Sequence, residues 1–119
     1  MEKKNLLLIS SSSKTGGGPS HIFQLSNLIK NNYNLFYAMP KLEKLPSYLE
    51  KINLLEIKER NINLTDIKNL IIFSRKNSID IIHAHGKGAS LIARIIKIFL
   101  NKPLIYTFHG IHTHCLSRL

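Results

Sequence analysis

The sequence has a single cysteine, few acidic residues and no long apolar run. Cys115 stands alone among 119 residues, so a disulfide framework is excluded and nothing indicates an oxidising compartment. No apolar run approaches the roughly 18 residues that cross a bilayer. The run at residues 6–9 is shorter than the apolar region of a signal peptide, which needs about 7–15 residues. We therefore expect a cytoplasmic protein, with contact at a membrane surface left open.

Acidic residues are outnumbered by basic ones. The chain has 17 Lys and Arg against 7 Asp and Glu, a formal net charge of +10. Such a charge fits nucleic acid or an anionic membrane surface. However, the lysines are spread over separate predicted elements, without the interleaved aromatics of a single-strand binding face. We therefore expect solvated lysines and no nucleic-acid partner.

Apolar residues make up 44% of the chain, enough to exclude wholesale disorder, and they alternate between two patterns. Short, nearly continuous apolar runs predict buried strands at 5–10, 34–38, 54–57, 79–83 and 103–108. Helical spacing predicts helices at 19–30, 41–52, 65–76 and 87–100. Strands that alternate with helices predict an α/β fold with a Rossmann-like parallel sheet and helices on both faces. The domain looks unfinished, because no capping helix comes after the last predicted strand.

Two of these helices carry more specific predictions. Thr65 is the expected N-cap of the helix at 65–76. In the helix at 87–100 the polar residues form one narrow stripe, so that helix is expected to be buried on most sides. The stripe consists of Lys87, Ser90, Arg94, Lys97 and Asn101.

Most glycines and histidines fall in three loops, at 11–18, 83–88 and 109–112, each after a predicted strand. Ligands of such sheets bind beyond the carboxyl ends of the strands, where strand order reverses. In the first loop, Gly16, Gly17 and Gly18 lead into a helix that starts at Pro19, an arrangement that favours an anion. The loop matches neither the Walker pattern nor Gly-x-Gly-x-x-Gly. It is either a phosphate cradle or a tight turn without a ligand.

The histidines of the other two loops are the candidate chemical groups. His83 and His85 lie two apart on a strand and should face the same side, one as a core or hydrogen-bonding residue and the other toward the cleft. Acidic partners are scarce nearby, so we expect no metal site. His109, followed by Gly110, ends the last strand. It either orients or deprotonates a substrate hydroxyl or is satisfied by backbone.

Other catalytic schemes lack their residues. The chain has no Gly-x-Ser-x-Gly elbow and no loop carboxylate pair for glycosidase chemistry. It also lacks an Asp-x-Asp pair for a metal-bound nucleotide.

Three motifs together resemble the N-terminal domain of family-4 glycosyltransferases, which have the GT-B fold. They are Ser-Lys-Thr-Gly-Gly-Gly-Pro-Ser-His at 13–21, Asp-Ile-Ile-His-Ala-His-Gly at 80–86 and Tyr-Thr-Phe-His-Gly at 106–110. The resemblance runs from about residue 4 to 111. It implies transfer of a sugar from a nucleotide-sugar to an acceptor hydroxyl, with retention at the anomeric carbon and without a metal or a further cofactor.

The resemblance also assigns residues to roles. Gly17 and Gly18 hold the place of the diglycine that lies against the donor's diphosphate and sugar. His109 matches the histidine at the reaction centre, and is the expected catalytic residue. The residues expected to line the cleft are His85, Lys14 and Gly110. The implied partners are a nucleotide-sugar, a sugar or lipid-linked acceptor in cell-surface polysaccharide or glycolipid synthesis, and the inner membrane face.

After residue 111 the sequence departs from the family. The 119 residues contain no Glu-x7-Glu motif, so we expect the nucleotide-sugar domain to be missing, and residues 112–119 no longer resemble the family. We expect a reading frame cut short, by a frameshift or a split gene, whose product needs a second chain that carries the missing domain. Two alternatives stay open: a stand-alone anion- or nucleotide-binding module, and an inactive remnant.

Overall fold

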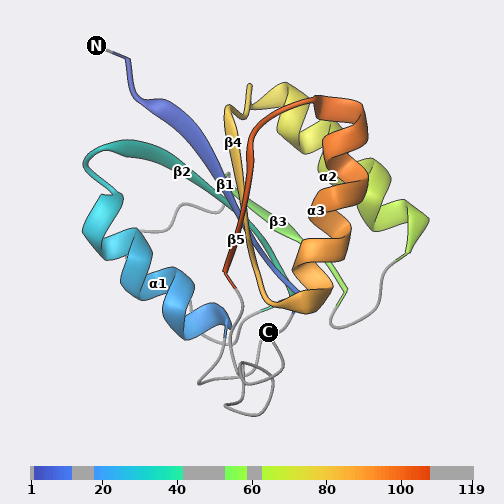
Figure 1. The fold of residues 1–119 in the computed structure, drawn as a ribbon, viewed down its shortest axis with the longest axis horizontal. Helices are drawn as coiled ribbons and strands as arrows, with labels where there is room; N and C mark the ends of the chain where they lie inside the picture. The colour runs from blue at the N-terminus through green and yellow to red at the C-terminus, as the bar shows by residue number, and fades with distance from the viewer. Residues whose placement is uncertain (1, 12–17, 42–52, 59–62, 108–119) are drawn as a thin grey trace, which may run out of the picture.

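The protein folds around a five-stranded parallel sheet. The computed structural model describes residues 2–11, 18–41, 53–58 and 63–107. The strands are β1 (Lys4–Ser10), β2 (Tyr33–Met39), β3 (Leu54–Glu56), β4 (Ile81–His85) and β5 (Leu104–Thr107), in the order β3-β2-β1-β4-β5 (Figure 1). All neighbours in the sheet are parallel. The predicted Rossmann-like α/β fold is confirmed.

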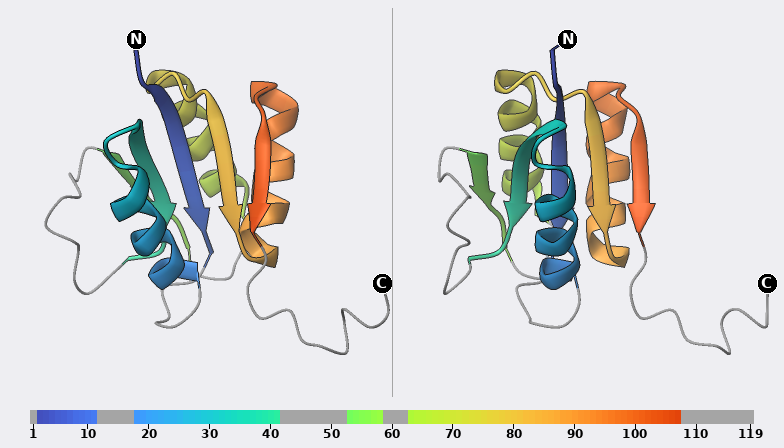
Figure 2. Two further views of the ribbon diagram at one scale, coloured as in Figure 1. Left: turned by 60° about the vertical axis from the view of Figure 1, so that its left-hand side comes forward. Right: turned by 90° about the vertical axis from the view of Figure 1, so that its left-hand side faces the viewer.

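In the described residues, three helices cover the two faces of the sheet. They are α1 (Gly18–Ile29), α2 (Leu64–Lys76) and α3 (Lys87–Leu100). Figure 2 shows α1 on one face and α2 and α3 on the other. Leu6 and Leu8 of β1 pack in the core cluster on the α1 side, whereas Leu7 and Ile9 pack with α2 and α3. Because β1 is buried on both faces, its sequence is a continuous apolar run rather than an alternating one.

The fourth strand lies two residues later than the sequence predicts. β4 runs from Ile81 to His85, not from 79 to 83, and pairing with β1 starts at Leu6 and Ile81. Just before the strand, the backbone N–H of Asn5 donates to Asp80 Oδ2 at 2.8 Å, and the N–H of Asp80 donates to the Asn5 carbonyl at 2.8 Å. These bonds hold Asp80 at the amino edge of the sheet. Both His83 and His85 therefore lie within the strand.

The prediction of Thr65 as the N-cap of α2 is wrong. The cap is Asn63, in extended conformation, and its Oδ1 accepts the N–H of Asp66 at 2.8 Å. Its Nδ2 also donates to Asp66 Oδ2 at 3.0 Å. Asn and Thr are both favoured at this position, but Asn63 is the residue that both accepts the Asp66 N–H and donates to the Asp66 carboxylate.

The prediction that α3 is buried on most sides is also wrong. Leu91 is 47% exposed, Ile98 79% and Phe99 55%. The helix packs on the sheet through one stripe, which includes Ala89, Ile92, Ala93 and Ile96. Its outward face thus carries apolar as well as basic side chains in the described part of the chain.

Two predictions lie outside the described residues: the helix at 41–52, of which only Lys41 is described, and the divergent tail at 112–119. Across the described ranges, the structure contains no helix with the length and apolar content needed to span a bilayer.

Candidate functional site

The strand order reverses between β1 and β4, and polar residues gather there. Along the chain, the strands run outward from β1 to β2 and β3, then restart on the other side of β1 with β4 and β5. At the carboxyl ends of β1 and β4, Ser10 and His85 are cross-strand partners, 1% and 2% exposed. The first residues of α1 and α3 lie at the same edge (Figure 2). Helix N-termini carry partial positive charge, so this edge favours an anion.

The two histidines of β4 stack against each other. The ring centroids of His83 and His85 are 4.2 Å apart, with an interplanar angle of 30°. The expectation that they face the same side is confirmed. His83 Nε2 lies 2.7 Å from Thr107 Oγ1 of β5, which fixes the ring of His83 beside the sheet edge. Since a hydroxyl both donates and accepts, this contact serves either neutral tautomer of His83.

Glycines allow close packing at the turn between β4 and α3. Gly86, the N-cap of α3, has φ 92°, a conformation that residues with a side chain rarely adopt. Its N–H donates to the Thr107 carbonyl at 2.8 Å, and Ser90 Oγ donates to its carbonyl at 2.8 Å. Gly88 lies directly against the Ser11 side chain, where a Cβ would overlap Ser11 Oγ. The backbone of α3 therefore approaches the end of β1 as closely as glycine allows.

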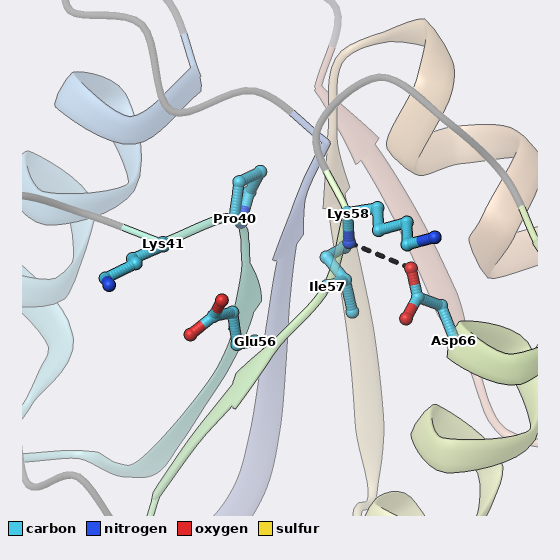
Figure 3. A pocket seen from close by; sticks show the side chains of 6 residues that line it. All are labelled: Pro40, Lys41, Glu56, Ile57, Lys58 and Asp66. Atoms are coloured by element: carbon cyan, nitrogen blue, oxygen red, sulfur yellow. Dashed lines mark hydrogen bonds between the residues drawn. The ribbon is translucent and has the colours of Figure 1, made fainter.

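A pocket of about 420 Å³ lies at the same edge of the sheet, beyond β2 and β3 (Figure 3). Pro40 and Lys41 come after β2, Ile57 and Lys58 come after β3, and Asp66 belongs to the first turn of α2. The remaining lining residue is Glu56. The N–H of Lys58 donates to Asp66 Oδ2 at 2.8 Å. Two ammonium groups and two carboxylates thus line one hollow, a mixture that suits a ligand with several hydroxyls.

The structure places some of the predicted site residues and not others. Gly18 begins α1 and His85 ends β4, both at the carboxyl edge. The predicted roles of Lys14, Gly17, His109 and Gly110 fall outside the described residues. Within the described ranges, no three His, Cys, Asp or Glu side chains are grouped to hold a metal ion. The roles assigned from the sequence to the donor-binding, cleft-lining and catalytic residues all stay predictions.

Sequence reasoning missed Thr107 and the pocket beyond β2 and β3. The pairing of His85 with Thr107 in the sheet depends on the register of β4 and β5, which no sequence pattern supplies. The pocket depends on Lys58 and Asp66, eight residues apart and joined by a hydrogen bond. The one sign of this pocket in the sequence was Asp66, an acidic residue in the first turn of a helix.

A parallel sheet covered on both faces, with its polar residues at the strand-order reversal, defines an α/β protein of the type in which ligands bind at the carboxyl edge. The chain belongs to glycosyltransferase family 4, whose family model matches residues 15–118. The match includes most of residues 112–119, which the motifs alone would separate from the family. The proposed division of the chain at residue 111 stays a prediction.

Other comparisons add little. No curated protein matches the chain. Among solved structures, the crystal structure of Prb, the PH1109 protein redesigned for binding, is similar, with a TM-score of 0.47 and 13% sequence identity. That likeness covers 98% of this chain and 86% of the other.

Proposed function

We propose that this chain is the acceptor-side domain of a retaining glycosyltransferase that uses a nucleotide-sugar donor. The observation that carries the proposal is the buried pairing of Ser10 with His85 at the strand-order reversal, in a chain that belongs to glycosyltransferase family 4. The first turns of α1 and α3 lie at the same edge, and their partial positive charge suits the donor's diphosphate.

In the proposed reaction the acceptor hydroxyl oxygen bonds to the anomeric carbon of the donor sugar. The bond between that carbon and the diphosphate oxygen breaks, and the acceptor's proton passes to the departing diphosphate.

His109 is the proposed catalytic residue beside the reacting atoms. His83, tied to Thr107, holds the stacked ring of His85 in place. His85, Lys14 and Gly110 are the proposed cleft-lining residues, and Gly17 and Gly18 the donor-binding ones.

The pocket beyond β2 and β3 is the proposed acceptor subsite. Its carboxylates, Glu56 and Asp66, accept hydrogen bonds from sugar hydroxyls, and its ammonium groups, Lys41 and Lys58, donate them. Among the described lining residues there is one carboxylate for each ammonium group, which favours a neutral, hydroxyl-rich acceptor over a strongly charged one.

Binding is the first test, because the described domain forms one side of the proposed cleft and by itself neither closes over the donor nor excludes water. We expect negligible transfer by the isolated chain. In an amide NMR titration with UDP-glucose and GDP-mannose, at least one donor should perturb residues 10–11 and 85–88. The H85A variant should weaken this response, whereas K97A, on the outward side of α3, should not. The absence of a response at this edge to either donor would overturn the proposal.

Activity is then measured with a second chain that supplies the nucleotide-sugar domain. Both chains are incubated with labelled donor and membranes of the source cell, and label in lipid and polysaccharide is counted. Incorporation that requires both chains supports the split enzyme. Donor binding without incorporation in any mixture favours the stand-alone nucleotide-binding module instead.

We also propose that the outward face of α3 contacts an anionic membrane surface. Lys87, Arg94 and Lys97 are exposed beside the exposed Leu91 and Ile98, and α3 contains no acidic residue. Apolar side chains flanked by cations are typical of helices that lie in the lipid interface. Sedimentation with vesicles of phosphatidylcholine and phosphatidylglycerol should capture the chain, and the L91D/I98D variant should stay in solution. Equal capture by pure phosphatidylcholine would contradict this contact.

A further inference from the structure

A second cavity lies at the amino edge of the sheet, opposite the carboxyl edge where the stacked histidines lie. It has a volume of about 290 Å³ and is formed where α2 and α3 end and β4 begins. The lining residues that matter here are Ser74, Arg75, Ser78, Asp80, Phe99 and Lys102. None of them belongs to the candidate site at the carboxyl edge.

One residue that lines this cavity has a buried hydroxyl with no partner in the described part of the chain. Ser74 is 1% exposed, and its Oγ forms no hydrogen bond there. Its carbonyl, in contrast, accepts the N–H of Ile79 at 3.0 Å in the cap of α2. A buried hydroxyl without a hydrogen bond destabilises a fold, and nearly all such groups find a partner. A ligand in the cavity that Ser74 lines would supply that partner.

Two cations line the same cavity. Arg75 Nη2 donates to the Phe99 carbonyl at 3.2 Å, which joins the end of α2 to the end of α3 and holds the guanidinium at the cavity. A guanidinium has five N–H donors, and within the described residues only Nη2 of Arg75 is engaged, so other donors can serve a ligand. Lys102 adds a second positive charge. Arginine and lysine together are typical of sites that bind phosphate groups.

The rest of the lining suits hydroxyl groups and a carbon skeleton. Asp80 is the one carboxylate among the described lining residues, and its Oδ2 accepts the N–H of Asn5. A carboxylate has about four acceptor positions, which leaves acceptors for hydroxyls of a ligand. Ser78 contributes a further hydroxyl, and Phe99 an apolar surface.

We propose that the cavity at the amino edge binds a phosphate monoester of a small sugar or polyol. Arg75, Lys102 and the Ser74 hydroxyl bind the phosphate, and Asp80 accepts hydrogen bonds from the hydroxyls of the ligand. The site is separate from the carboxyl edge and does not depend on the function proposed there.

Glucose 6-phosphate is the probe for this site, with glucose and inorganic phosphate as comparison ligands. In amide NMR titrations of the full chain, glucose 6-phosphate should perturb residues 74–80 and 99–102 and leave 85–88 unchanged. Glucose should bind far more weakly. Equal affinity for inorganic phosphate would overturn the assignment of a hydroxyl-bearing ligand. No response, or a response centred on 85–88, would overturn the site itself.

Three variants test the residues. K102Q should weaken glucose 6-phosphate binding at least about tenfold, as expected for one hydrogen bond to a charged group, whereas K97Q should not weaken it. S74A should raise the melting temperature of the ligand-free chain yet reduce the further rise caused by glucose 6-phosphate. A purely structural Ser74 would do the opposite, because S74A would then lower the melting temperature and leave binding unchanged.

Discussion

Ser11 and Gly88 lie in direct contact where the end of β1 meets the first turn of α3. The contact joins the two strand ends between which the strand order reverses. It brings the backbone of α3 close to the buried pair formed by Ser10 and His85. The glycine at position 88 thus permits this close approach beside the candidate site.

The G88A substitution should destabilise the protein through this contact. The new Cβ would overlap Ser11 Oγ and would lie 3.1 Å from Ser11 Cβ. Rotation of the serine side chain relieves part of the overlap, so the expected loss in the free energy of unfolding is about 1 kcal/mol, at the low end for overpacking. The second substitution S11G should restore most of the loss. Urea denaturation of both single variants and the double variant measures the coupling.

G86A is the matched control for this pair. No atom of the described residues would meet a Cβ at Gly86, but its φ of 92° disfavours any side chain. G86A should therefore be destabilising by about 1 kcal/mol or more, and S11G should give no rescue. Equal rescue of G86A and G88A would show that the steric interpretation is wrong.

The bond between His83 and Thr107 should contribute measurably to stability. T107V keeps the shape of the side chain but removes the hydroxyl that lies 2.7 Å from His83 Nε2. We expect a loss of about 1 kcal/mol in the free energy of unfolding. T107S, which keeps the hydroxyl, should lose less. A T107V protein as stable as the T107S protein would contradict a structural role for this bond.

The fold was largely predictable from local patterns, whereas the site was not. β1 could be predicted because residues 6–9 are all apolar. A strand needs apolar residues on both of its sides only where both faces of the sheet are covered. The stacking of His83 and His85 is a consequence of the period of two in a strand. The partner of His83, in contrast, depends on the register between β4 and β5, and register is a property of the whole sheet.

The wrong predictions also arose because residue type and local spacing do not determine which contacts form in the fold. The narrow polar stripe on α3 indicates only that few residues of the helix are polar. It does not show that other elements cover the apolar ones, and Ile98 is in fact 79% exposed. Likewise Thr65 is a good capping residue by type, but Asn63 is the one that reaches the N–H of Asp66. Composition identifies candidates, and geometry selects among them.

The cap of α2 gives a direct comparison of these two residues. N63A removes the acceptor of the Asp66 N–H and the donor to Asp66 Oδ2, and should cost about 1 kcal/mol of stability. Thr65 is exposed in the first turn, so T65A should change stability by less than about 0.5 kcal/mol. Thermal unfolding measured by circular dichroism distinguishes them. A larger loss for T65A would restore Thr65 as the cap.

The end of α2 offers a stabilising substitution. Ser78 adopts φ 51°, and its N–H and that of Ile79 donate to the carbonyls of Arg75 and Ser74. These two bonds form a Schellman cap, in which the left-handed position is usually glycine. S78G should therefore raise the free energy of unfolding by about 0.5–1 kcal/mol, since relief of the left-handed strain exceeds the added chain entropy.

Asn101, the left-handed C-cap of α3 with φ 52°, is the control. Asparagine tolerates this conformation better than serine does, through local hydrogen bonds of its side chain. N101G should accordingly give a smaller gain than S78G when both are measured by urea denaturation. A loss of stability in S78G would show that the Ser78 hydroxyl contributes more to the fold than its backbone strain costs. In that case, a substitution that raises the free energy of unfolding through the cap of α2 would have to be made at a position other than Ser78.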